Sequence, residues 1–111
     1  MIVVEVDPGI CGLPSTIRAW SENGRHVRLE ITSACEDVRK LARKLRQVDG
    51  FSELYTREEV PPLYLRIREH CRHVACPVPL AVFKGIEAAL GAALPRDVEI
   101  RIRREHTLHG G

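Results

Sequence analysis

Residues 16–31 read TIRAWSENGRHVRLEI, and this stretch decides the fold. On both sides of Asn23-Gly24, apolar residues alternate with polar or charged ones. Alternation at every second residue is typical of a strand with one buried face. Asn-Gly favours a tight hairpin because both residues tolerate the positive φ angles that such a turn needs. The stretch therefore predicts a β-hairpin whose apolar side faces a core, formed by Ile17, Ala19, Val27, Leu29 and Ile31.

Two further strands are expected outside this hairpin. Ile2–Val6 is an apolar run that ends at Asp7-Pro8-Gly9, a strong turn signal. Near the other end of the chain, Val98, Ile100 and Ile102 alternate with charged residues, which predicts a last strand over residues 98–102.

The first helix is predicted after a capping box. The Ser33 hydroxyl would accept a first-turn amide while Glu36 reaches back, and apolar residues then recur at intervals of three and four until Gly50. Residues 51–61 form an irregular link whose apolar side chains are expected to lie on the core, namely Phe51, Leu54 and Tyr55.

Two more helices are predicted in the second half of the chain. Leu63 to Cys71 fits both a strand and a helix, and Pro62 favours the helix because proline suits a first helical turn. Pro77 and Pro79 likewise suit the opening turn of a helix over residues 78–91.

These elements predict a single α+β domain over residues 1–104. Their order is β-β-β-α-α-α-β, with about four strands in one mostly antiparallel sheet and the helices packed on one face. A chain of 111 residues, 44% of them hydrophobic, is long enough for one core. Residues 105–111 are expected to form a flexible tail.

Charge and hydropathy limit the classes of partner. The net charge is +2, and 17 basic residues are interspersed among 15 acidic ones, so nucleic acid is not expected as a partner. The sequence contains no apolar run of the roughly 18 residues that a membrane span needs, and its amino terminus does not resemble a signal peptide. We expect a cytoplasmic protein, for which a homodimer is an open alternative. Composition does not decide whether it is an enzyme.

Four cysteines are the chemically distinctive residues: Cys11, Cys35, Cys71 and Cys76. In a reducing compartment they are expected to be thiols or metal ligands rather than disulfides. Four thiolates can bind tetrahedral zinc or an iron–sulfur cluster. The short spacing is Cys-x4-Cys rather than the Cys-x2-Cys of structural zinc sites, and a cysteine followed by proline is common among cluster ligands, so we favour the cluster.

Other interpretations of these residues stay open. His70 and His73 flank Cys71 and could replace a thiolate, although both also suit a helix surface. The cysteines could instead be inert thiols buried in the core of an interaction protein, with Trp20 and Arg18 as a contact patch. A metal centre would serve electron transfer, sensing or cluster delivery, with a redox or sulfur-transfer protein as partner.

Two family resemblances follow from the cysteine motifs. Cys76-Pro77-Val78-Pro79, which opens a helix leading to the strand 98–102, resembles the Cys-Pro-x-Pro segment of the TusA/SirA sulfur-carrier proteins. That resemblance implies that Cys76 is a nucleophile that carries a persulfide. With Asp-Pro-Gly-x-Cys-Gly near its start, the whole chain is also similar to small uncharacterised four-cysteine proteins of anaerobic bacteria and archaea. No activity comes with this second resemblance.

Overall fold

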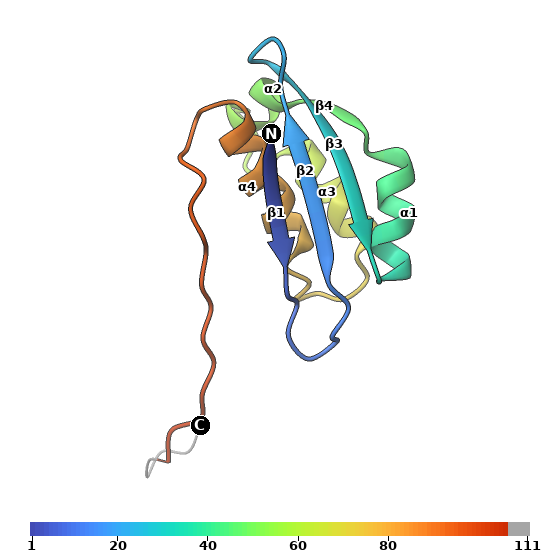
Figure 1. Cartoon of the computed structure of the whole chain (residues 1–111), viewed down its shortest axis with the longest axis vertical. Helices are drawn as coiled ribbons and strands as arrows, with labels where there is room; N and C mark the ends of the chain where they lie inside the picture. The colour runs from blue at the N-terminus through green and yellow to red at the C-terminus, as the bar shows by residue number, and fades with distance from the viewer. Residues whose placement is uncertain (107–111) are drawn as a thin grey trace.

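Four strands form one antiparallel sheet in the order β1-β2-β3-β4 (Figure 1). The computed structural model describes residues 1–106. The strands are β1 (Ile2–Val6), β2 (Ser15–Trp20), β3 (His26–Ser33) and β4 (Gln47–Asp49), and the helices are α1 (Glu36–Lys44), α2 (Gly50–Leu54), α3 (Pro62–His70) and α4 (Val78–Ala89). The predicted α+β class, with a four-stranded antiparallel sheet, is confirmed.

The predicted hairpin joins β2 to β3 and carries much of the core. Ile17 lies opposite Ile31 and Ala19 opposite Leu29, and all four side chains are buried. The turn is wider than the predicted tight one, since Gly24 alone adopts a positive φ angle, of 73°. Asn23 contributes its side chain instead, because its Oδ1 accepts the amides of Arg25 and His26 at 2.9 and 2.8 Å.

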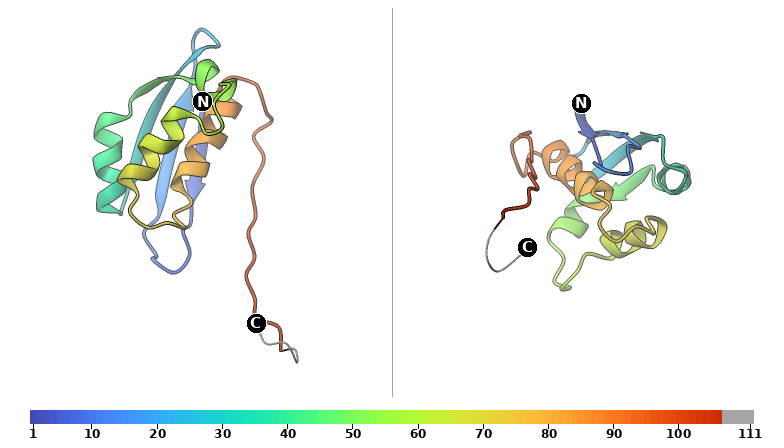
Figure 2. Two further views of the ribbon diagram at one scale, coloured as in Figure 1. Left: turned by 180° about the vertical axis from the view of Figure 1, so that it is seen from behind. Right: turned by 90° about the horizontal axis from the view of Figure 1, so that it is seen from below.

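The helices cover one face of the sheet, as predicted (Figure 2). α4 packs across β1 and β2, α1 packs against β3, and α3 packs against α1 and α4. The centre of the core is formed by side chains from both layers, of which the largest with almost no exposure are Ile17, Val27, Val38, Leu63, Ile67, Val82 and Ile86. Leu63–Cys71 is therefore helical up to His70, as Pro62 indicated, and the helix predicted at 78–91 is present as α4.

The fourth strand is not the predicted one. The first helix ends at Lys44, and Gln47–Asp49 pairs with β3 as β4, with Val48 opposite Val27. The helical pattern predicted too long a helix because Leu45 and Val48, which are buried, also continue the helical spacing from Leu41. Residues 98–102, predicted as the last strand, are in neither helix nor strand and are exposed to solvent. The observed order is therefore β-β-β-α-β-α-α-α.

The link after β4 also differs from the prediction. It begins with the short helix α2, which Asp49 caps by accepting the Ser52 amide at 3.0 Å. Phe51 and Tyr55 do not lie on the core, since both are exposed and their rings contact each other at a centroid distance of 4.8 Å. Leu54 does pack against the core.

The ends of the chain are described only in part. The predicted domain boundary at residue 104 lies in an exposed stretch without regular structure, and most of the predicted tail, residues 107–111, lies outside the described residues. Within residues 1–106, no helix is both long and apolar enough to cross a membrane.

Two glycines test the packing of this core. A Cβ atom on Gly50 would lie 2.9 Å from side-chain carbons of Ile86 and Val27, whereas one on Gly85 would meet Val4 at 3.4 Å, an ordinary contact. We expect Gly50→Ala to lower the free energy of unfolding by about 1–3 kcal/mol through overpacking. Gly85→Ala should leave it unchanged or raise it by up to about 1 kcal/mol, because alanine is the better helix former. Urea denaturation measures both, and equal stabilities would contradict the packing described.

Candidate functional site

The chain reversals bring all four cysteine-bearing segments to one end of the sheet (Figure 1). Cys11 lies in the β1–β2 loop and Cys35 in the turn between β3 and α1, while Cys71 and Cys76 lie in the connection from α3 to α4. β1 and β3 end here, and α1 and α4 begin here. We call this region the cysteine end. The sequence separates its members by up to 65 residues, and the antiparallel topology brings them together.

Cys71 lies at the centre of the cysteine end. It caps the carboxyl end of α3, where its amide donates to the Ile67 carbonyl at 3.1 Å, and its side chain is 2% exposed. The pKa of the Cys71 thiol is raised to about 12, above all by burial and in addition by the charge and hydrogen bond of the neighbouring Cys76 thiol and the charge of Cys35. Three of the four thiols are therefore neighbours, and Cys71 keeps its proton at neutral pH.

Cys35 is the residue that precedes α1. The predicted capping box is wrong: Ser33 belongs to β3, and its Oγ accepts the amide of Cys35 itself at 2.9 Å. The Ser33 hydroxyl also lies 2.7 Å from the Ser15 hydroxyl across the strand pair. Glu36 pairs with Arg39 at 3.0 Å instead of reaching back. The two serines thus hold the backbone that positions Cys35.

An ion pair joins α1 to the α3–α4 connection. Asp37 receives two hydrogen bonds of 3.1 Å from the Arg72 guanidinium, which follows Cys71 directly in the chain. The hydrogen bond from Arg72 lowers the pKa of the Asp37 carboxyl, and Arg72 also lies within the electrostatic influence of Cys35. Arg68 donates to the Cys71 carbonyl at 3.2 Å. Sequence reasoning missed these residues because a pair 35 positions apart leaves no local pattern.

Cys76 lies one residue before Pro77, the N-cap of α4, and is half-buried. Its amide donates to the His73 carbonyl at 3.1 Å, which closes the turn, and Pro77 then starts the helix. The first amides of an α-helix have no partner within the helix and point towards its amino end, where they favour negative charge. Cys76 therefore lies close to this helix start, and its thiol neighbours that of Cys71.

Cys11 differs from the other three cysteines because it is exposed to solvent. It is exposed on a loop of residues 7–14, in which the Gly12 amide donates to the Gly9 carbonyl at 2.9 Å. The end of this loop is fixed, since the Pro14 carbonyl accepts the Ala34 amide at 3.1 Å, next to Cys35. The loop is thus anchored at the cysteine end, with Cys11 on its solvent side.

The structure supports the predicted set of metal ligands in one respect and not in another. Cys35, Cys71 and Cys76 are neighbours, and every cysteine is a free thiol. In residues 1–106, however, no three His, Cys, Asp or Glu side chains are placed so that they could hold one ion in the conformation seen. Of the two histidines considered as ligands, His70 has its ring Nδ1 2.9 Å from the Arg66 carbonyl of its own helix, and His73 is exposed.

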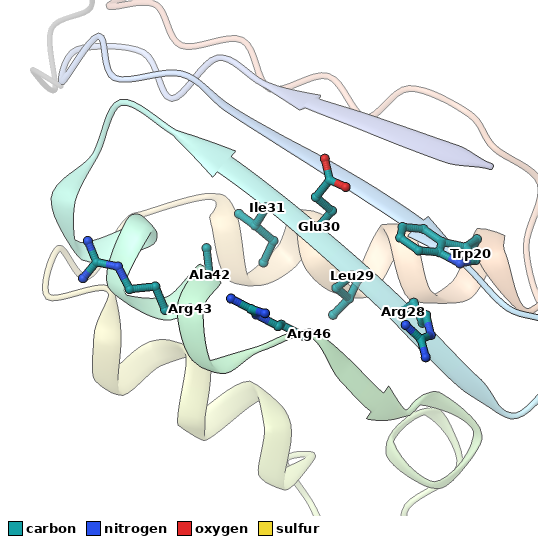
Figure 3. A pocket seen from close by; sticks show the side chains of 8 residues that line it. All are labelled: Trp20, Arg28, Leu29, Glu30, Ile31, Ala42, Arg43 and Arg46. Atoms are coloured by element: carbon teal, nitrogen blue, oxygen red, sulfur yellow. The ribbon is translucent and has the colours of Figure 1, made fainter.

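An open hollow of about 400 Å³ lies elsewhere, between β3 and the carboxyl end of α1 (Figure 3). Arginine side chains and the half-buried Trp20 surround it, and its lining is formed by Trp20, Arg28, Leu29, Glu30, Ile31, Ala42, Arg43 and Arg46. Trp20 thus contributes to a basic surface as well as to cross-strand packing. The cysteine end lies at the opposite end of α1.

Comparison with known proteins places the chain in one family. Residues 2–102 match the model of a family of unknown function, DUF6951. The chain belongs to this family. The match includes the whole sheet, all four helices and all four cysteines. No curated protein and no solved structure matches the chain.

The Asp37–Arg72 ion pair predicts a specific pH dependence. The folded-state pKa of Asp37 is lowered from its ordinary 3.8, so the pair contributes stability above pH 3.8 and loses it as the pH falls through the lowered value. We expect Asp37→Asn to lower the melting temperature at pH 7, and the difference from the native chain to shrink below pH 4. Glu22→Gln, on the exposed hairpin loop, is the matched control. A difference independent of pH would contradict the pairing.

Burial of Cys71 predicts the order of thiol alkylation in metal-free protein. Only the thiolate reacts, so Cys71 should be the slowest of the four to react with iodoacetamide at pH 8 and the exposed Cys11 the fastest. The Cys71 rate should rise between pH 9 and about 12, as its proton is lost. Mass spectrometry of tryptic peptides measures both rates. Reaction of Cys71 as fast as Cys11 would show that the thiol is not buried.

Proposed function

We propose that this protein is a metal-binding module whose cysteine end holds an iron–sulfur cluster through thiolates, with zinc as the alternative metal. The observation that carries the proposal is the convergence of four cysteine-bearing segments at one end of the sheet, where Cys35 and Cys76 pack against the core that contains Cys71. Cys11, Cys35, Cys71 and Cys76 are the proposed ligands. Four thiolates are the usual ligand set of both iron–sulfur clusters and structural zinc.

The surroundings of these thiols suit thiolate ligands. Two helices begin at the cysteine end, and their free amides can donate to thiolate or sulfide. The guanidinium of Arg72 adds positive charge near Cys35. In the metal-free protein, by contrast, burial above all, and the charges of Cys76 and Cys35 in addition, disfavour the Cys71 thiolate and raise its pKa to about 12. A cation would reverse this balance and displace the protons.

Loading requires the thiols to move together, because the present conformation does not place three of them on one ion. The loop of residues 7–14 is the segment that must move furthest, since Cys11 is exposed while Pro14 is already fixed beside Cys35. Binding would then tie the β1–β2 loop to the starts of α1 and α4. Metal should therefore raise stability as well as occupy the site.

The test is the metal content of protein purified without oxygen and without a histidine tag. We expect iron with acid-labile sulfide and a broad absorption band at about 400 nm. Zinc without sulfide would keep the thiolate site and exclude the cluster. Protein that contains neither metal nor sulfide, and takes up neither on reconstitution, would contradict the proposal.

Single Cys→Ser variants assign the ligands. Each of the four should lower metal content and melting temperature together. Cys11→Ser is the most informative, because Cys11 is exposed and its loss cannot disturb the core. Val74→Ser is the matched control, since Val74 is 79% exposed in the same connection as Cys71 and Cys76. Full metal content in Cys11→Ser would remove Cys11 from the ligand set, and full content in all four would refute the site.

A sulfur carrier is the second candidate function, favoured by the half-buried position of Cys76 at the start of α4. In that function the Cys76 thiolate would attack the terminal sulfur of a donor persulfide, and the donor would leave as a thiolate. The strand that completes the resemblance to the TusA/SirA proteins is not formed at 98–102. Metal-free protein that gains the mass of one sulfur atom on Cys76, with Cys11→Ser unaffected, would favour this function over the metal module.

A further inference from the structure

Residues 97–103, which we call the exchange segment, have the sequence of a strand but no neighbouring strand. They run clear of the domain and are open to solvent over their whole length (Figures 1 and 2). Val98, Ile100 and Ile102 are 52, 71 and 92% exposed. Arg101 pairs with Glu99, two residues away, so charged side chains gather on the opposite side. One apolar and one charged side is the pattern of a strand at the margin of a sheet with one covered face.

The sheet has a matching free edge at β1. β1 pairs with β2 on one side only, and no other strand of the described chain lies on its other side. Ile2 and Val4, on the helix-covered face, are only partly buried, whereas Ile17 and Ala19 of the adjacent strand have no exposed surface. Free edges of this kind attract a further strand. β1 is five residues long, the same length as the alternating run 98–102.

We propose that the exchange segment of one chain pairs with β1 of a second copy, and the reverse, to form a two-fold dimer. Each domain then has a five-stranded sheet. Val98, Ile100 and Ile102 extend the apolar layer beside Ile2 and Val4. Asp97, Glu99, Arg101 and Arg103 come to the open face, which carries Glu5 on β1, and a register that sets an arginine opposite Glu5 makes the charges complementary. Reciprocal exchange of an identical element is a common route to a dimer.

The way the chain leaves α4 favours a second copy over the segment's own β1. After α4, the amides of Ala92 and Ala93 both donate to the Glu87 carbonyl, at 2.9 and 3.3 Å, and Gly91 adopts a positive φ angle of 73°. These bonds hold the chain as far as Ala93, and beyond it the chain runs beside the β1 side of the domain without packing on it (Figures 1 and 2). Pairing with its own β1 requires the chain after Ala93 to change its course, whereas pairing with a second copy does not.

The test combines sedimentation with hydrogen exchange on the full chain. The native protein should sediment at twice the mass of one chain, with slow amide exchange over residues 98–102. Ile100→Asp should raise the dimer dissociation constant by about 30-fold or more and make those amides exchange fast, while the domain stays folded. Leu65→Asp, at a residue of α3 that is 52% exposed, is the control and should remain dimeric.

Several outcomes would overturn the proposal. If the native chain is monomeric and the amides of residues 98–102 exchange fast, the segment pairs with no strand. If the native chain is monomeric and the amides of residues 98–102 exchange slowly, the segment pairs with β1 of its own chain. If Ile100→Asp remains dimeric, another surface holds the dimer. If Leu65→Asp dissociates the dimer as much as Ile100→Asp does, the added charge acts generally and not at the segment. Metal content is measured in every sample, so that these results stay separate from the occupancy of the cysteine end.

Discussion

The packing of α4 across β1 and β2 is the interaction on which the rest of the structure depends. The helix lies so close to the sheet that a single carbon on Gly85 would already touch Val4, Ala19 and Ile17. Val82 and Ile86 have no exposed surface, and burial of each is worth about 2–3 kcal/mol. Because α4 is held in this position, its first turn lies beneath the end of the sheet. Cys76 and the connection from α3 are brought to that end with it.

The cysteine end follows from this placement together with the serine and arginine contacts around it. Ser15 and Ser33 hold the turn before α1, and Arg72 and Arg68 hold the α3–α4 connection. These contacts hold the segments that carry Cys35, Cys71 and Cys76 at the cysteine end, with Cys11 on an adjacent exposed loop. Loss of the proton from the buried Cys71 thiol is unfavourable there. The packing around the thiols keeps these segments together.

The two edges of the sheet differ in how far they are covered. On the β3 side, β4 and α1 cover the edge, and the Leu29 amide is satisfied by the Arg46 carbonyl at 2.9 Å. On the β1 side the edge is open, and its apolar residues remain partly exposed. A free edge can pair with the strands of other chains and lead to aggregation unless something covers it. An unpaired segment with strand character on the same chain is the simplest match for that edge.

Local pattern alone determined the β2–β3 hairpin, the first strand and the helices α3 and α4, because alternation, proline positions and turn residues act over a few neighbours. It also marked the four cysteines, though only tertiary structure decided that three of their thiols are neighbours around a buried Cys71. The end of α1 and the strand β4 could not be predicted from the sequence, since the buried Leu45 and Val48 also continue the helical spacing of α1. Residues 98–102 have strand character without a strand, because a strand exists only when a neighbouring backbone satisfies its hydrogen bonds.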